Sequence, residues 1–176
     1  MTHSADLDHT SARLSIIQSK GTLDWAYPPM ILASTAATMG KEVEIFFTFY
    51  GIECLKKNTR TMKVSPVGNP AMPLRLPFGP PALRAINWRG LPDLVWSLPG
   101  MTALATRLFH QSVAQQNQLP FDQLRHLCLD LGVRFTVCQM SMEWLGYRPE
   151  DLIDGLSYAG AATYFAHSPD NQSLFI

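Results

Sequence analysis

Apolar positions along the chain form short, nearly continuous runs that are separated by glycine, proline and polar residues. The runs over residues 14–19, 42–49, 133–138 and 173–176 are rich in Ile, Leu, Val and Phe. Compact runs of this length are typical of strands that are buried on both faces of a parallel sheet. We therefore predict a strand in each of these four ranges.

Helical segments are expected between the strands. Residues 28–39 are rich in alanine and precede a glycine, so we predict a helix that begins at a proline pair and ends at that glycine. Further helices are predicted over residues 101–116, 121–131, 141–144 and 160–167. This alternation indicates an α/β fold with a mainly parallel sheet, and 176 residues suit a single domain.

The alternation breaks between residues 55 and 92, which contain seven prolines and neither Asp nor Glu. Because prolines disrupt regular structure, we predict a long Pro-rich basic flap at about residues 55–100, within a single domain of residues 14–176. Seven of the 14 Lys and Arg residues of the chain lie in this flap: Lys56, Lys57, Arg60, Lys63, Arg75, Arg84 and Arg89.

The uncompensated charge of the flap has two interpretations. It can attract an anionic substrate or carrier toward the functional site, with Arg75, Arg84 and Arg89 as the candidate anion-binding residues. It can equally be a solvated surface loop. Aromatic residues interleave with the charges, as in some proteins that bind single strands, but the formal net charge is zero, so no nucleic-acid partner is expected.

The overall composition narrows the class of protein. Charged residues make up 16% of the chain, which leaves apolar surface for a homo-oligomer. Apolar residues 91–101 are interpreted as an oligomer contact in preference to a contact with a membrane surface. No apolar run has the length of about 18 residues that a membrane span needs. Residues 1–13 resemble neither a signal nor a transit peptide, so we expect a disordered tail on a cytoplasmic protein.

The three cysteines, Cys54, Cys128 and Cys138, show no CxxC or Cys/His spacing. Neither a metal site nor a disulfide framework is therefore predicted, and free thiols in a reducing compartment are expected. Cys128 shares an apolar helix face with Leu124 and Leu131, which favours a core role. Cys54 follows the second strand and is the candidate second thiol.

Cys138 ends a predicted strand just ahead of a predicted helix. Ligands of parallel α/β sheets bind outside the carboxyl ends of the strands, and a helix N-terminus favours the thiolate form of a cysteine. We therefore predict that Cys138 lies in a crevice that a small anion can reach, covered by the flap. The alternative is that Cys138 is a small apolar residue at the end of a strand.

A series of short segments, in order along the chain, resembles the DsrE-like family in its larger, DsrE/DsrF-related form. The segments that carry the resemblance are Ser19-Lys20-Gly21-Thr22-Leu23-Asp24, Ile45-Phe46-Phe47-Thr48-Phe49, Pro70-Ala71-Met72-Pro73, Leu98-Pro99-Gly100-Met101, Cys138-Gln139-Met140-Ser141-Met142, Glu150-Asp151-Leu152-Ile153-Asp154-Gly155 and Ala159-Gly160-Ala161-Ala162-Thr163-Tyr164.

The resemblance implies a three-layer α/β/α domain similar to flavodoxin that forms homo-oligomers. It also implies that a cysteine, here Cys138, carries sulfane sulfur or thiosulfate and exchanges it with TusA-like carriers and rhodaneses, in sulfur oxidation or sulfur relay. No phosphate-binding glycine loop is present, so no nucleotide, flavin or other cofactor is predicted.

Two functions remain open at this point. The first is a sulfur carrier or sulfurtransferase that acts through Cys138, with catalytic and stoichiometric transfer both compatible with the sequence. The second is a non-catalytic assembly subunit or membrane-associated subunit that uses the same fold only for binding.

Overall fold

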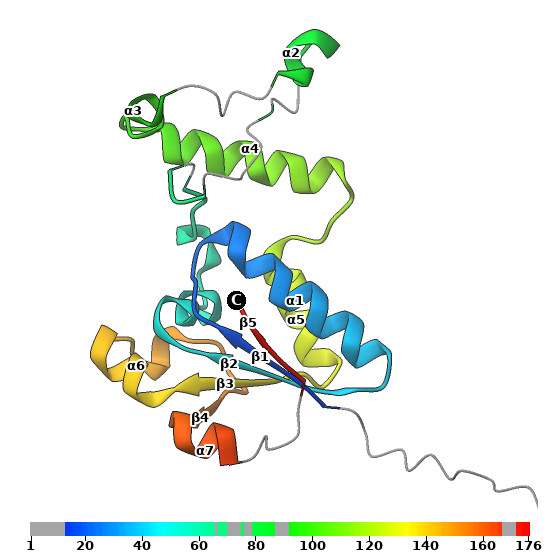
Figure 1. The fold of residues 1–176 in the computed structure, drawn as a ribbon, viewed down its shortest axis with the longest axis vertical. Helices are drawn as coiled ribbons and strands as arrows, with labels where there is room; N and C mark the ends of the chain where they lie inside the picture. The colour runs from blue at the N-terminus through cyan, green and yellow to red at the C-terminus, as the bar shows by residue number, and fades with distance from the viewer. Residues whose placement is uncertain (1–12, 66, 70–74, 76–78, 87–91, 167–171) are drawn as a thin grey trace, which may run out of the picture.

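The computed structural model describes residues 13–65, 67–69, 75, 79–86, 92–166 and 172–176. The predicted tail, except for Arg13, and the candidate anion-binding residue Arg89 lie outside these ranges. The described chain forms one sheet with helices on both faces and a helical extension beyond one of them (Figure 1).

The sheet confirms the predicted α/β class. Its five strands run in the order β4-β3-β2-β1-β5, and every pair of neighbours is parallel. The order differs from the 2-1-3-4-5 order of flavodoxin, because β2 lies between β1 and β3. The strands are β1 (Arg13–Gln18), β2 (Glu42–Phe47), β3 (Arg134–Cys138), β4 (Ser157–Ala159) and β5 (Gln172–Phe175).

Helices cover the two faces of this sheet unequally. The longer helices are α1 (Leu23–Thr38), α4 (Met101–Gln115) and α5 (Phe121–Asp130), and the shorter ones are α2 (Pro81–Ala85), α3 (Asp93–Trp96), α6 (Gln139–Leu145) and α7 (Ala161–Ala166). Short 3-10 helices are η1 (Phe49–Leu55), η2 (Thr59–Thr61) and η4 (Pro149–Asp151).

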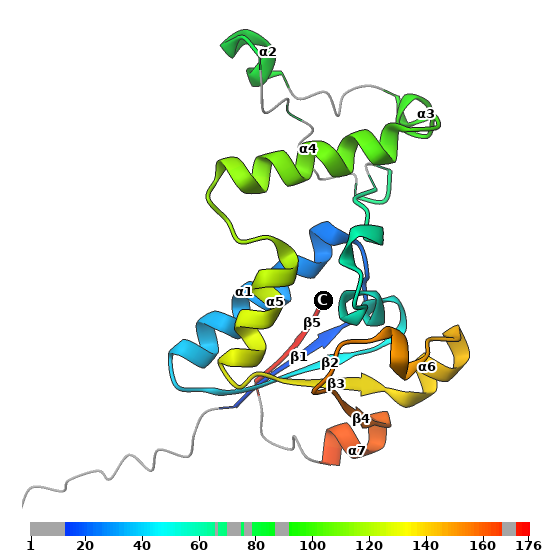
Figure 2. The same ribbon diagram turned by 180° about the vertical axis from the view of Figure 1, so that it is seen from behind.

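The direction of the chain across the sheet explains this arrangement. Crossovers between parallel strands are right-handed, so the steps from β1 to β2 and from β2 to β3 place α1 and α5 on the same face. The step from β4 back to β5 runs in the opposite direction and places α7 on the other face, as Figures 1 and 2 show. The large apolar core lies under α1 and α5, and in the described part of the chain the short helix α7 covers the opposite face.

Helix α1 begins earlier than the sequence predicted. It starts at Leu23 and contains both Pro28 and Pro29 in its interior. Because Pro29 has no N–H, it cannot bond to the carbonyl of Trp25 within the helix. The buried side chain of Gln18 donates to that carbonyl instead, with an Nε2–O distance of 3.3 Å. The Gln18 side chain, at the end of β1, therefore gives the Trp25 carbonyl the hydrogen bond that Pro29 cannot supply.

Two glycines allow the loops after β1 and β2 to pack against each other. The N–H of Gly51 donates to the carbonyl of Ser19 at 3.0 Å. A Cβ atom on Gly51 would overlap the carbonyl oxygen of Gln18, and one on Gly21 would overlap that of Tyr50. Glycine is needed at both positions because backbone approaches backbone there.

The flap is partly helical, which corrects the prediction of an irregular segment. Helix α2 begins at Pro81, in the first turn, where proline is tolerated. The base of the flap is attached to the core: Val64 is fully buried, and its N–H donates to the hydroxyl of Thr106 on α4 at 3.0 Å. The attachment places α4 beyond α1, with α3 beside the start of α4 and α2 further out (Figure 1).

Candidate functional site

Cys138 is the last residue of β3, an inner strand, and the N-cap residue of α6. It pairs with Ala159 of β4, at the carboxyl edge of the sheet. This is the position predicted for it, although α6 begins directly after Cys138 instead of at Ser141. Ser141 is buried and bonds to the hydroxyl of Thr48 with an O–O distance of 3.0 Å, which links α6 to the end of β2.

The predicted crevice at Cys138 is not found, because the side chain is only 2% exposed. It lies in a small cluster with Phe46, Tyr164 and partly buried Ile17, on the face of the sheet that α7 covers. The ring of Tyr164 stacks on that of Phe46, with centroids 4.4 Å apart. Its hydroxyl bonds to the hydroxyl of buried Ser15. In this structure α7 therefore covers the site, and Tyr164 attaches it to the sheet through Ser15 and Phe46.

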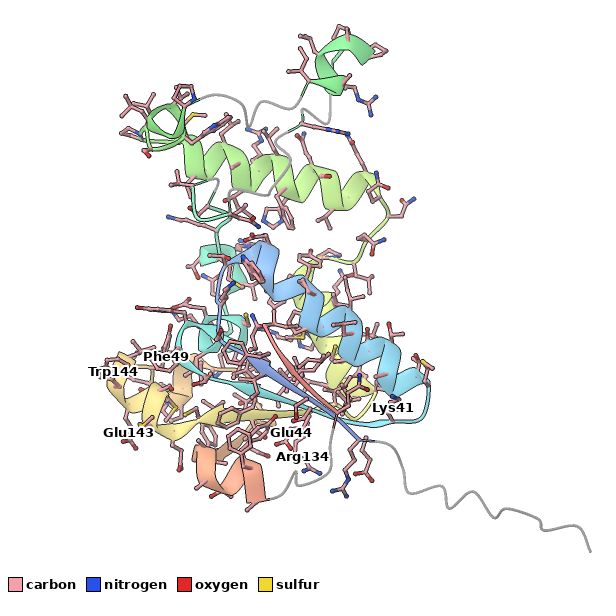
Figure 3. All side chains as sticks on the ribbon, viewed as in Figure 1. Lys41, Glu44, Phe49, Arg134, Glu143 and Trp144 are labelled. Carbon is pink, nitrogen blue, oxygen red and sulfur yellow. The ribbon has the colours of Figure 1, made fainter. Side chains whose placement is uncertain are left out.

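Exposed aromatic residues surround the carboxyl edge next to Cys138. The rings of Phe49 and Trp144 meet edge to face, with centroids 5.6 Å apart, and Figure 3 shows them at the α6 end of the sheet. Trp144 is 70% exposed. Phe49 has a φ of 46°, in the left-handed region that rarely suits a bulky side chain. The local backbone thus presents an apolar surface beside the cysteine.

Cys54, the candidate second thiol, follows β2 and so lies at the same edge of the sheet as Cys138. Its side chain nevertheless points into the large core on the opposite face, and it is fully buried. Burial raises the pKa of the Cys54 thiol to about 12, and the nearby Arg125 guanidinium offsets this only in part. The structure therefore does not bring Cys54 and Cys138 together.

Cys128 belongs to the core, as predicted. It is fully buried on α5, and its thiol donates to the carbonyl of Met30 at 3.3 Å. Burial raises the pKa of this thiol to about 11. Both Cys54 and Cys128 are therefore protonated thiols at neutral pH, and neither is poised for nucleophilic attack.

The described part of the flap does not cover Cys138, which corrects the prediction made for it. Arg75 and Arg84 both line, with Ser112 of α4, a cavity of about 480 Å³. Helix α2, which carries Arg84, stands at the opposite end of the molecule from α6 (Figures 1 and 2). The physical reason is that the flap is anchored to α4, which lies beyond α1, on the other side of the sheet from Cys138.

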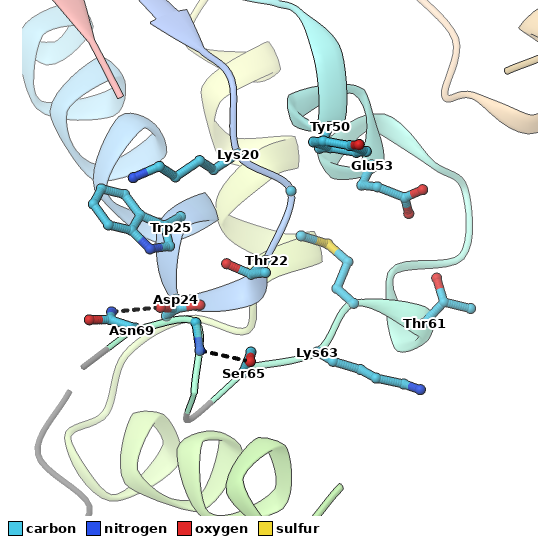
Figure 4. Close-up of a pocket in the computed structure, with 13 residues that line it drawn as sticks. Lys20, Thr22, Asp24, Trp25, Tyr50, Glu53, Thr61, Lys63, Ser65 and Asn69 are labelled. Atoms are coloured by element: carbon cyan, nitrogen blue, oxygen red, sulfur yellow. Dashed lines mark hydrogen bonds between the residues drawn. The ribbon is translucent and has the colours of Figure 1, made fainter. Parts of the chain in front are cut away.

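A second cavity, of about 490 Å³, was not predicted from the sequence. It lies at the carboxyl ends of β1 and β2, where ligands of parallel sheets commonly bind. Figure 4 shows one wall formed by Lys20, Trp25 and Asp24 and another by Tyr50 and Glu53. The polar run after the first strand was a signal for this site, but the facing wall comes from η1 and the flap. We refer to this cavity as the β1 edge pocket.

Within the described ranges, no group of three or more His, Cys, Asp or Glu side chains is arranged to hold a metal ion. None of the helices in the same ranges has the length and apolarity needed to cross a membrane.

Known proteins that are similar to this chain match it over nearly its whole length. The chain is 43% identical over 160 residues to sulfur carrier protein DsrE2 of Allochromatium vinosum, covering 91% of this chain and 94% of that protein. It is 27% identical over 165 residues to the uncharacterized protein YrkE of Bacillus subtilis, covering 93% and 96%. The crystal structure of YchN from E. coli superposes with a TM-score of 0.48 at 9% identity, covering 94% of this chain and 99% of YchN. The model of the DsrE/DsrF/DrsH-like family matches residues 10–175, so the chain belongs to this family.

Proposed function

We propose that this protein is a sulfur carrier that holds sulfur on Cys138. The observation that supports this most directly is the position of Cys138, which ends an inner parallel strand and precedes α6 at the functional edge of the sheet. The name of the 43% identical relative, a sulfur carrier protein, supports the same function. Cys54 and Cys128 belong to the large core on the opposite face, and burial raises the pKa of both thiols.

The chemistry is thiolate attack on a sulfur–sulfur bond. With thiosulfate, the Cys138 thiolate bonds to the outer sulfur and sulfite leaves, so Cys138 becomes a persulfide. With tetrathionate, the thiolate bonds to an inner sulfur and thiosulfate leaves, so Cys138 carries a thiosulfonate group. Each reaction forms one sulfur–sulfur bond and breaks one bond to sulfur, and neither requires a further oxidant.

Loading requires movement of α7, because Tyr164 and Phe46 cover the thiol in the closed arrangement. Helix α7 contains six residues, and Tyr164 is its buried residue. Opening α7 separates Tyr164 from Phe46 and Ser15 and uncovers Cys138 at the carboxyl edge. The exposed Phe49–Trp144 pair beside it offers an apolar surface for a partner that presents a sulfur-bearing group.

The experiment is mass spectrometry of the intact protein after incubation with thiosulfate or with tetrathionate. Expected mass increases are about 32 Da for one sulfur atom and about 112 Da for a thiosulfonate group. Cys138→Ser should remove both adducts, and Cys54→Ser and Cys128→Ser should keep them. If wild type and Cys138→Ser load equally, the assignment of Cys138 is wrong.

The biological setting belongs to the same proposal. TusA-like carriers and rhodaneses are the expected exchange partners in the cytoplasm, within sulfur oxidation or sulfur relay, and a homo-oligomer is expected. Purified TusA-like protein charged with a persulfide should transfer its sulfur to wild type and not to Cys138→Ser. Repeated turnover with excess donor and acceptor would distinguish catalytic transfer from stoichiometric carriage.

The burial of Cys138 favours one competing function, a non-catalytic assembly subunit. In that case Cys138 is an apolar residue of the small cluster and its thiol stays covered. No adduct would then form on native protein with either reagent, while the unfolded protein would react at its cysteines.

A further inference from the structure

The β1 edge pocket contains charged groups whose interactions within the described chain are incomplete. Asp24, in the first turn of α1, accepts a hydrogen bond from the side-chain amide of Asn69 through Oδ2, at 2.8 Å. Its other oxygen, Oδ1, is buried and has no hydrogen-bond partner in the described structure. Because a buried acceptor without a donor is unfavourable, an occupant that donates to Oδ1 would bind favourably.

Two ammonium groups at the same pocket have no carboxylate partner among the described residues. Lys20 lies with its Nζ 3.2 Å from the centroid of the Trp25 ring, and Lys63 stands on the flap side. Among the described residues, neither ammonium group lies within ion-pair distance of a carboxylate. The Lys20 ammonium is held in place by the ring beneath it, which prepares it to bind an anionic group.

The remaining acidic residue of the pocket is already engaged. Glu53 accepts hydrogen bonds through Oε1 from Lys56, at 2.7 Å, and from the hydroxyl of Tyr147, at 2.8 Å. The charged groups left for an occupant, among the described residues, are therefore the carboxylate of Asp24 and the ammonium groups of Lys20 and Lys63. A simple anion would be repelled by Asp24, and a simple cation would be repelled by the lysines.

We propose that the β1 edge pocket binds a small peptide-like zwitterion with one ammonium group and one or two carboxylates. The ammonium donates to Asp24 Oδ1, and the carboxylates pair with Lys20 and Lys63. The pocket volume of about 490 Å³ falls within the usual range of small-molecule sites. The attachment of the flap to α1, in which the Leu23 N–H donates to the Lys63 carbonyl at 3.0 Å, fixes the two walls relative to each other. This site is independent of the chemistry proposed for Cys138.

The test uses calorimetric titration of the full chain with S-methylglutathione, which has one ammonium, two carboxylates and no free thiol. Glutarate, with two carboxylates and no ammonium, is the comparison ligand. Saturable binding of S-methylglutathione is expected, and Lys20→Met or Lys63→Met should weaken it about 10-fold, the loss typical of one charge-assisted hydrogen bond. Lys41→Met, at the far end of α1 (Figure 3), is the matched control and should bind as wild type does.

Asp24→Asn gives the decisive result, because it keeps the shape of the side chain and removes its charge. It should weaken S-methylglutathione about 10-fold and should bind glutarate at least as tightly as wild type does. Circular dichroism checks that this variant folds. The proposal is overturned if wild type does not bind S-methylglutathione, or if Asp24→Asn and wild type bind it equally. Cys138→Ser should bind as wild type does, which separates this test from that of the sulfur carrier.

Discussion

The cover over Cys138 gives the most direct prediction, because a hydrogen bond between Tyr164 and Ser15 attaches α7 to β1. Tyr164 is 3% exposed and Ser15 is fully buried, so the bond between their hydroxyls is shielded from water. Tyr164→Phe keeps the ring that stacks on Phe46 and removes only the hydroxyl. The Ser15 hydroxyl is then left buried without this partner, which destabilises the closed arrangement by about 1–3 kcal/mol.

The expected effect follows from the population of the open arrangement. If Cys138 reacts only when α7 opens, a loss of about 1–3 kcal/mol raises the open population, and the labelling rate, by about 5- to 150-fold. The assay is labelling by an aromatic disulfide reagent at neutral pH in a background with Cys54→Ser and Cys128→Ser. Ser15→Ala should accelerate labelling as well. In the double variant, the free-energy change calculated from the labelling rate should be smaller than the sum of the changes in the two single variants, because the two hydroxyls are partners in one hydrogen bond.

Local and global opening have to be distinguished in the same experiment. In the parent protein with all three cysteines, Tyr164→Phe should accelerate labelling of Cys138 much more than labelling of Cys54, which lies in the other core. Equal acceleration of both would mean that labelling proceeds through global unfolding. An unchanged Cys138 rate in Tyr164→Phe would refute the idea that α7 is the cover.

Two further predictions concern stability. Gly21→Ala should lower the free energy of unfolding by about 1–3 kcal/mol in urea denaturation, because the added Cβ overlaps the Tyr50 carbonyl. Gly160→Ala is the control and should change the free energy of unfolding little, because its Cβ would meet nothing within 4 Å. Equal effects of the two changes would contradict this packing. Burial of Cys54 raises its pKa from 9.0 to about 12, so folding favours the protonated thiol; its contribution to stability is complete below pH 9 and is lost as the pH rises toward 12. Thiolate absorbance should therefore develop at higher pH in native than in unfolded protein, and coincident titrations would contradict the assignment.

Much of the sheet could be predicted from the sequence, because a strand buried on both faces leaves a continuous apolar run. The runs at β1, β2 and β3 predicted these strands to within two residues at each end. The same reasoning placed Cys138 at a strand end. The three-residue strand β4 was missed, since Ser157, Tyr158 and Ala159 are too few to form a pattern.

The start of α1 was mispredicted for a different reason. Local rules place a proline pair at the beginning of a helix, and here the pair lies inside it. The bond that tolerates Pro29 comes from Gln18, on a neighbouring element. Local helix propensity cannot account for a hydrogen-bond donor that reaches the helix only when β1 and α1 pack together.

The sequence by itself determined the α/β class, the family and the position of Cys138 at the end of a strand, because these depend on short-range patterns. Only the tertiary structure decided what surrounds that cysteine. The bond that closes α7 joins Ser15 and Tyr164, which are 149 residues apart, and the flap expected over Cys138 instead packs against α4 beyond the opposite face. Contacts of this kind depend on how the whole chain packs, so no local pattern of apolar and polar residues specifies them.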